Sequence, residues 1–399
     1  MIAYNKILLS NLLVVKKTKQ WFSRDLINGA QMASVLNKYP IEYFKPNIFI
    51  KVGLFLFTLF LISAGLGLFS LVTMSIFMND NSFEGYSIVV SIVFGGACVF
   101  FLEKFIQWRN WYSNGIDDAL LYSALSFIFS AVAFSISNNL NDEDGLLLLC
   151  FIYLPFLIAA AVRYIDRVVT IFMVVCIYTI FFLLIMKIGD VAKFIMPFAF
   201  MALSAAFYFI VKKQMYLPQI IHYKGCLKVI KSIALIVFYV SGNYYVIRES
   251  SVEFFHLDLN EGQDIPMALI FYAFTAFVPL LYLFFGLRSK DKLMVWAALL
   301  LIAVSAITFK YYFSLGHPEV SLTIAGIMMI VLAYASIKYL INDKNGITFK
   351  DDPNEDNFLK TNAEALVIAQ SFGTHAQPID TGVEMGGGQF GGGGSGDKF

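Results

Sequence analysis

The segment from Val52 to Met78 contains no charged residue and no polar stripe. At about 1.5 Å per residue, a helix of this length is longer than the hydrocarbon core of a bilayer, which is roughly 30 Å thick. A helix at the surface of a soluble core would present a polar face to water. The segment therefore predicts a first membrane-spanning helix, which separates a polar head from a long apolar region.

The composition agrees with a membrane protein. Of the 399 residues, 59% are hydrophobic and 14% are charged, whereas soluble domains average about 25% charged residues. Further apolar segments of spanning length follow the first, at roughly Tyr86–Phe105, Ala119–Ser137, Leu146–Tyr164, Val168–Ile188, Phe194–Val211, Val229–Ile247, Ile265–Leu287, Leu293–Phe313 and Val320–Ile341. Together they predict an all-α polytopic transmembrane helix bundle of about ten spans, in contact with the lipid bilayer.

The charges of the connecting loops alternate along the chain. One set of connections is basic, as at Lys212 and Lys213, and the head belongs to this set. The other set is acidic, as at Asp142 and Glu143. Basic loops face the cytoplasm in membrane proteins. The pattern therefore predicts a multi-pass protein with both termini in the cytoplasm.

Residues 1–47 predict a short helical hairpin on the cytoplasmic side. Asn28 and Gln31 have the spacing of a capping box, and Pro40 would end the helix that follows. Two helices of this size are expected to pack on each other or against the membrane region. The many lysines of the head suggest either a docking surface for anionic lipid or a protein partner, or a simple determinant of topology.

The tail, residues 343–399, differs sharply from the membrane region at 48–342. Thr361 and Glu364 have capping-box spacing and predict one short helix. The glycine-rich run from Gly386 to Phe399 has too few apolar residues to form a core. It predicts either a flexible tail or a peptide whose Phe390 and Phe399 engage a protein partner.

No pattern in the chain points to an enzyme, a cofactor or a metal. The four cysteines form no C-x-x-C pair and the four histidines are separated; catalytic motifs with glycine, histidine or serine are not found. Asp117 and Asp118 open the third span, where they either cap the helix or form a carboxylate pair. The net charge of +1 gives no basic field that would attract nucleic acid.

Polar and aromatic residues gather at the outer ends of two spans. The seventh span ends in Ser-Gly-Asn-Tyr-Tyr, and the ninth ends in Lys-Tyr-Tyr. Because both groups should reach the outer face at a similar depth, we consider an outward-facing pocket; an aromatic belt at the membrane interface is the alternative. The pocket residues would be Asn243, Tyr244, Tyr245, Arg248, Lys310, Tyr311 and Tyr312.

Three segments carry a resemblance to a known family. They are WFSRDLINGAQMASVL in the head, YYFSLGHPEVSLTIAGIMMIVLAYASIKYL near the end of the membrane region, and GGGQFGGGG in the tail. They resemble a family of bacterial, Bacteroidota-type polytopic membrane proteins with a predicted membrane domain of unknown function. The resemblance implies a location in the bacterial inner membrane and carries over no site residues.

Two classes of function remain open. The first, which the basic head and the exposed tail favour, is a sensor, scaffold or envelope-assembly component that binds protein partners through its head or tail. The second is a transporter or flippase-like carrier of a neutral or amphipathic solute, which the number of spans and the helix-kinking residues Pro155, Pro197 and Pro279 suggest.

Overall fold

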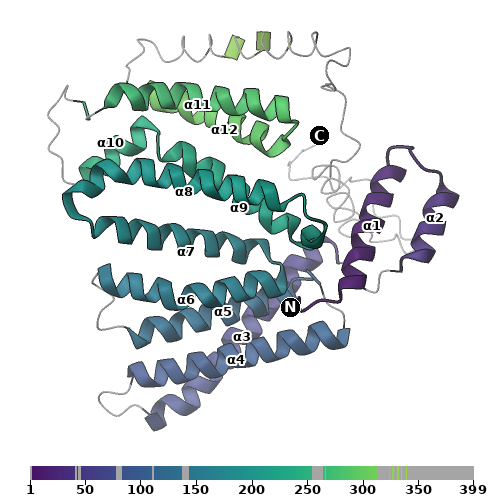
Figure 1. Cartoon of the computed structure of the whole chain (residues 1–399). Helices are drawn as coiled ribbons and strands as arrows, with labels where there is room; N and C mark the ends of the chain where they lie inside the picture. The colour runs from purple at the N-terminus through teal and green to yellow at the C-terminus, as the bar shows by residue number, and fades with distance from the viewer. Residues whose placement is uncertain are drawn as a thin grey trace, which may run out of the picture.

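The computed structural model describes residues 2–40, 43, 46–77, 83–109, 112–136, 143–253, 264–265 and 267–312, with isolated positions between 323 and 338. All regular structure in these residues is helical (Figure 1). The prediction of an all-α polytopic helix bundle is confirmed. The tail at 343–399, with its predicted helix and glycine-rich end, lies outside the described residues.

The first half of the bundle consists of long, nearly continuous helices. They are α3 (Ile48–Phe77), α4 (Phe83–Arg109), α5 (Ile116–Ser135), α6 (Glu143–Tyr164) and α7 (Arg167–Met186). Helices α4 and α5 pack closely, as do α6 and α7, and α3 packs on α5. Neighbours in sequence are therefore mostly neighbours in space, as Figure 1 shows.

The second half of the bundle combines long helices with shorter pieces. Its elements are η2 (Gly189–Val191), α8 (Ala192–Gln214), η3 (Pro218–Tyr223), α9 (Lys224–Val240), α10 (Tyr244–Glu253), α11 (Ala268–Ser289) and α12 (Lys292–Tyr312). Helix α9 packs on α7, α8 and α12, and α11 packs on α12. Helix α9 is thus the central element of this half.

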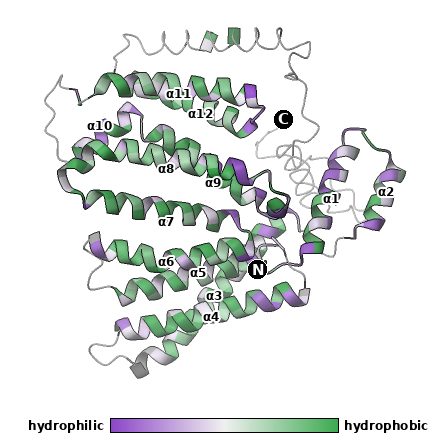
Figure 2. Cartoon of the chain, viewed as in Figure 1, coloured by the Kyte–Doolittle hydropathy of each residue, from purple (hydrophilic) through white to green (hydrophobic). Residues whose placement is uncertain are grey.

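The surface of the bundle is suited to lipid. In the most apolar 18-residue stretch of α3, 6% of the residues are buried, whereas the corresponding share in α7 is 44%. Helix α3 therefore exposes large side chains such as Phe60 and Leu71. Figure 2 shows apolar residues along the helices and hydrophilic residues gathered at helix ends. Such a surface is stable in hydrocarbon and would aggregate in water. The chain is an integral, multi-pass membrane protein.

The number of spans differs from the prediction in one respect. Eight helices in the described residues are long and apolar enough to cross a bilayer. The predicted seventh span, Val229–Ile247, is not one helix, because the chain bends by 73° between η3–α9 and α10; counting this pair as one broken span gives nine. The predicted tenth span, Val320–Ile341, lies largely outside the described residues, so the count of ten stays a prediction.

The head forms two helices, α1 (Lys6–Phe22) and α2 (Gly29–Lys38), that pack on each other (Figure 1). The predicted capping box is confirmed: the Gln31 amide donates to Asn28 Oδ1 at 2.8 Å, and the Asn28 amide donates to Gln31 Oε1 at 3.0 Å. The head also contacts the membrane region. The Ala3 amide donates to the Arg163 carbonyl at 2.9 Å, and the buried Tyr4 ring meets Tyr112 edge to face at 4.9 Å.

Candidate functional site

The break between α9 and α10 has a local cause in Ser241, Gly242 and Asn243. The amides of Gly242 and Asn243 donate to carbonyls three residues back, those of Tyr239 at 3.0 Å and Val240 at 3.2 Å, which tightens the end of α9. The Asn243 side chain then accepts from the Val246 amide at 3.4 Å and caps α10. The predicted continuous span is wrong because this tripeptide ends one helix and begins the next.

Glycine is required at position 242 by its contact with α11. A Cβ atom added to Gly242 would lie 2.2 Å from the Phe274 ring, where no atom fits. The missing side chain therefore allows the broken backbone to approach α11 closely.

A layer of buried, uncharged polar groups surrounds the break; we call it the polar seam. The Asn243 amide nitrogen donates to the Tyr239 hydroxyl at 2.9 Å and to Thr308 Oγ1 on α12 at 3.2 Å. The Tyr244 amide donates to Thr275 Oγ1 on α11 at 2.9 Å. All five residues are buried. The seam satisfies backbone and side-chain groups that lipid could not.

A pocket of about 220 Å³ lies beside the seam, between α7, α8, α9 and α10. Its wall is mostly apolar, with Phe200 and the kinking Pro197 from α8. Three serines, Ser241, Ser250 and Ser251, add hydroxyl groups, and no charged side chain lines it among the described residues. A hydroxyl that donates to the helix still has lone pairs with which to accept. The pocket can therefore hold an apolar group with a few hydrogen-bonding atoms.

The structure places the predicted site residues in different surroundings. Asn243 and Tyr244 are buried in the seam; the Tyr244 hydroxyl donates to Asp264, and its ring stacks on Tyr272 with centroids 4.0 Å apart. On α10, Tyr245 is 39% exposed.

Arg248 is partly buried on α10, and residues 310–312 form the last turn of α12, where their side chains lie outside the described part of the chain. The contact between Asn243 and Thr308 does bring the end of α12 beside the break. A pocket formed by all seven predicted residues, including Lys310, Tyr311 and Tyr312, stays a prediction.

Sequence reasoning did not find the groups on the neighbouring helices. Thr275 and Thr308 lie within apolar segments and carry no pattern of their own. The serine pair Ser250 and Ser251 follows a charged pair and resembles any polar loop in sequence. The signal that could have found the site is the Ser-Gly-Asn tripeptide, because glycine and asparagine are poor helix formers inside an apolar segment.

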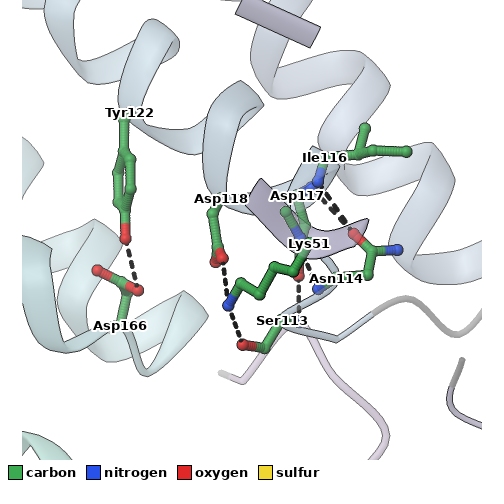
Figure 3. A network of polar contacts seen from close by, with 9 residues as sticks. Lys51, Ser113, Asn114, Ile116, Asp117, Asp118, Tyr122 and Asp166 are labelled. Atoms are coloured by element: carbon green, nitrogen blue, oxygen red, sulfur yellow. Dashed lines mark hydrogen bonds and ion pairs between the residues drawn. The ribbon is translucent and has the colours of Figure 1, made fainter. Parts of the chain in front are cut away.

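A second polar cluster lies where α3 meets the start of α5 (Figure 3). Lys51 Nζ forms an ion pair with Asp118 at 2.7 Å and donates to Ser113 Oγ at 2.6 Å. Asp117 accepts from the backbone amides of Ser113 at 2.5 Å and Asn114 at 3.0 Å. The two aspartates thus have separate partners, and Asp117 binds the loop before α5. The first amides of the helix are capped by the Asn114 side chain, which accepts from Ile116 at 3.1 Å and from Asp117 at 3.4 Å. This cluster holds a loop and two helices together.

Asp166 extends this cluster toward α7. Its carboxylate accepts from the Val169 amide at 2.8 Å, which caps α7, and from the Tyr122 hydroxyl at 3.1 Å (Figure 3). Burial raises the pKa of the Asp166 carboxyl above its ordinary value. The hydrogen bonds to the carboxylate offset part of that rise.

No protein-family model, curated protein or solved structure matches this chain. The resemblance to a Bacteroidota-type membrane family therefore stays a prediction. The broken helix, the polar seam and the pocket are the features of the described residues that bear on function.

Proposed function

We propose that this protein is a membrane carrier that binds a neutral or amphipathic solute at the break between α9 and α10. The observation that supports this best is the break itself, with a pocket on one side and the buried polar seam on the other. Non-helical backbone at membrane depth is tolerated only where protein or a water-filled cavity surrounds it. In carriers such broken helices commonly form the substrate site.

The chemistry of the pocket favours an amphipathic solute. Its wall offers apolar side chains and serine hydroxyls, with no charge among the described lining residues, so an ionised group would lose its hydration without compensation. At about 220 Å³ the pocket is smaller than most small-molecule sites, which range over about 300–1,000 Å³. It suits one apolar part of a ligand, such as a segment of an acyl chain or a ring.

Transport would require a rearrangement of the core beside α9. Tyr239, Leu235, Ala298 and Leu301 are buried and pack together in the middle of this half. This core lies along α9, beside the break. A carrier must open it during each cycle.

A sensor or scaffold would leave this core closed, and one observation favours that second function. Helix α2 has no buried residue in its whole length, so its surface is accessible to a protein partner. In this case the solute pocket would serve as a sensing site and nothing would cross the membrane. The two functions share the binding site and differ in transport.

A lipid-translocation assay tests the carrier function. The full chain is reconstituted in vesicles with a fluorescent short-chain phosphatidylcholine, and dithionite quenching measures the fraction of probe that reaches the outer leaflet. We expect translocation above protein-free vesicles, abolished by Ser250→Phe, which fills the pocket. The matched control is Val252→Phe, because Val252 is 42% exposed on the same helix.

Translocation equal to that of protein-free vesicles would argue against a carrier and in favour of the sensor. Equal rates in the two phenylalanine variants would show that any translocation bypasses the pocket.

A further inference from the structure

A second, larger pocket lies at the end of the bundle that the positive-inside rule assigns to the cytoplasm. It has a volume of about 530 Å³ and lies between the ends of α8, α9, α11 and α12. Its lining is strongly basic; we call it the lysine pocket. The lysines that line it are Lys212, Lys224, Lys228, Lys231, Lys290 and Lys292.

The sequence places these lysines on one wall by helical spacing. Lys224, Lys228 and Lys231 follow one another at four and three residues on α9, which puts them on one face. Across the pocket, Lys290 adopts a left-handed conformation with φ 57° at the end of α11. The Asp291 amide then donates to the Gly286 carbonyl at 2.9 Å, which closes the turn into α12.

One lysine of the pocket is neutralised and fixed. Lys231 is only 5% exposed, forms an ion pair with Asp291, and lies 5.5 Å from the centre of the Tyr208 ring. Lys212 lies 5.7 Å from the centre of the same ring. Tyr208 and Asp291 therefore fix the position of Lys231 in the wall of the pocket.

The charge of the pocket is unbalanced. Asp291 is the one acidic residue among the described lining residues, and it is already paired with Lys231. Lys292 also has an interaction of its own, so the excess positive charge comes from Lys212, Lys224, Lys228 and Lys290. Like charges gathered in a cavity repel one another more strongly than charges spread over an open surface, because a concave wall of low dielectric focuses the field. An anion in the pocket would relieve this repulsion.

Topology alone does not account for this arrangement. The positive-inside rule needs lysines near helix ends, and exposed lysines on the head satisfy it equally well. It does not require a cavity, a buried lysine or an aromatic ring beneath two ammonium groups. A cavity with a buried lysine in its wall is the additional observation that points to a ligand.

We propose that the lysine pocket binds a phosphate group, carried either by an anionic lipid headgroup or by a soluble phosphorylated compound. Ammonium groups bind phosphate through charge-assisted hydrogen bonds, and basic pockets between helices on the cytoplasmic side are suited to lipid headgroups. The volume lies within the range of small-molecule sites. The proposal does not depend on the carrier function, because this pocket is distinct from the one at the break.

The experiment compares two triple variants of the full chain in detergent. The pocket variant carries Lys224→Gln, Lys228→Gln and Lys290→Gln, which leaves the ion pair of Lys231 with Asp291 intact. The control carries Lys17→Gln, Lys19→Gln and Lys38→Gln, which removes the same charge from exposed positions of the head. Native mass spectrometry measures binding of phosphatidic acid, with phosphatidylcholine as the zwitterionic reference, and unlabelled pyrophosphate serves as a soluble competitor.

We expect phosphatidic acid to bind the pocket variant about tenfold more weakly than the original chain, and the control to stay within about twofold. Displacement by pyrophosphate would identify a soluble phosphate compound as a possible source, and no displacement would identify the lipid headgroup; both results support the pocket. Equal losses in the two triple variants, or no preference for phosphatidic acid over phosphatidylcholine, would overturn the proposal.

Folding is controlled separately. Melting temperatures without ligand show whether the pocket variant is intact, and a ligand that binds the folded state raises the melting temperature. If the triple variant unfolds, Lys228→Gln alone is compared with Lys17→Gln. If phosphatidic acid raised the melting temperature of both single variants equally, the result would count against the pocket.

Discussion

Two polar regions of the bundle, one in each half, use different interactions to hold polar groups in an apolar protein. In the first half, charged groups are paired at the helix ends, as between Lys51 and Asp118 or between Arg163 and Glu103. In the second half, uncharged groups are paired at a break in a helix, as between Asn243 and Thr308. Helices α3 to α7 are long, whereas the second half contains the break and both pockets described above.

This difference suggests a division of labour. In the first half, ion pairs and the close approach of Gly115 to the Lys51 carbonyl hold neighbouring helices together. Neutral hydrogen bonds between membrane helices contribute less, on average about 0.6 kcal/mol, so the polar seam can rearrange at lower cost. The halves should therefore differ in their response to mutation.

The largest effect is expected in the first half, at Gly115. This residue has φ 99°, and an added Cβ would lie 2.2 Å from the Lys51 carbonyl oxygen, a backbone atom that cannot turn aside. Gly115→Ala should destabilise the protein by about 3 kcal/mol, from both conformational strain and overpacking. Thermal unfolding in detergent measures the change. Gly96→Ala is the control, because nothing lies within 4 Å of its Cβ position; equal melting temperatures for the two variants would refute the close contact.

The next effect is expected at the ion pair of Lys51 with Asp118. A double-mutant cycle with Lys51→Met and Asp118→Asn should give a coupling of about 1–2 kcal/mol, because both side chains are mostly shielded from water. The free energy of unfolding of the four proteins provides the cycle. A coupling near zero would mean that the pair contributes no more than an exposed one.

A smaller effect is expected at the cap of α7. Asp166→Ala should cost about 1 kcal/mol, because the Val169 amide loses its acceptor. Asp166→Asn should cost much less: asparagine caps a helix as well as aspartate does, and burial, which raises the pKa of this carboxyl, already disfavours its charge. Comparing the two melting temperatures tests this. If Asp166→Asn lowered the melting temperature more than Asp166→Ala, the negative charge itself would be needed.

The smallest effect is expected in the polar seam. A double-mutant cycle with Asn243→Leu and Thr308→Val should give a coupling of about 0.6 kcal/mol, the average for hydrogen bonds between membrane helices. The measurement is unfolding in the same detergent as for Lys51 and Asp118. If the coupling energy between Asn243 and Thr308 were larger than that between Lys51 and Asp118, the comparison between the two halves would be reversed.

The sequence predicts what depends on local pattern. Apolar length locates α3 to α8, α11 and α12, and the spacing of Asn28 and Gln31 predicts the cap of α2. Hydropathy averages over a window, so it does not detect that Ser241 to Asn243 end one helix and begin another.

Contacts between distant residues could not be predicted in this way. Lys51 and Asp118 belong to different helices, and so do Asn243 and Thr308, so their pairing depends on how the helices pack. The lysine pocket shows the same limit. Loop charge predicts that its lysines lie at one end of the bundle, but the packing of α8, α9, α11 and α12 brings them together around one cavity.

The most direct test of the central claim is to map where an amphipathic solute binds. The full chain in nanodiscs is cross-linked by light to a fatty acid that carries a diazirine, with and without excess unlabelled fatty acid, and the modified peptides are identified by mass spectrometry. We expect labelling within residues 237–251 and 196–200 that unlabelled fatty acid competes away and that Ser250→Phe abolishes. Labelling confined to lipid-exposed helices such as α3, with no competition and no effect of Ser250→Phe, would contradict it.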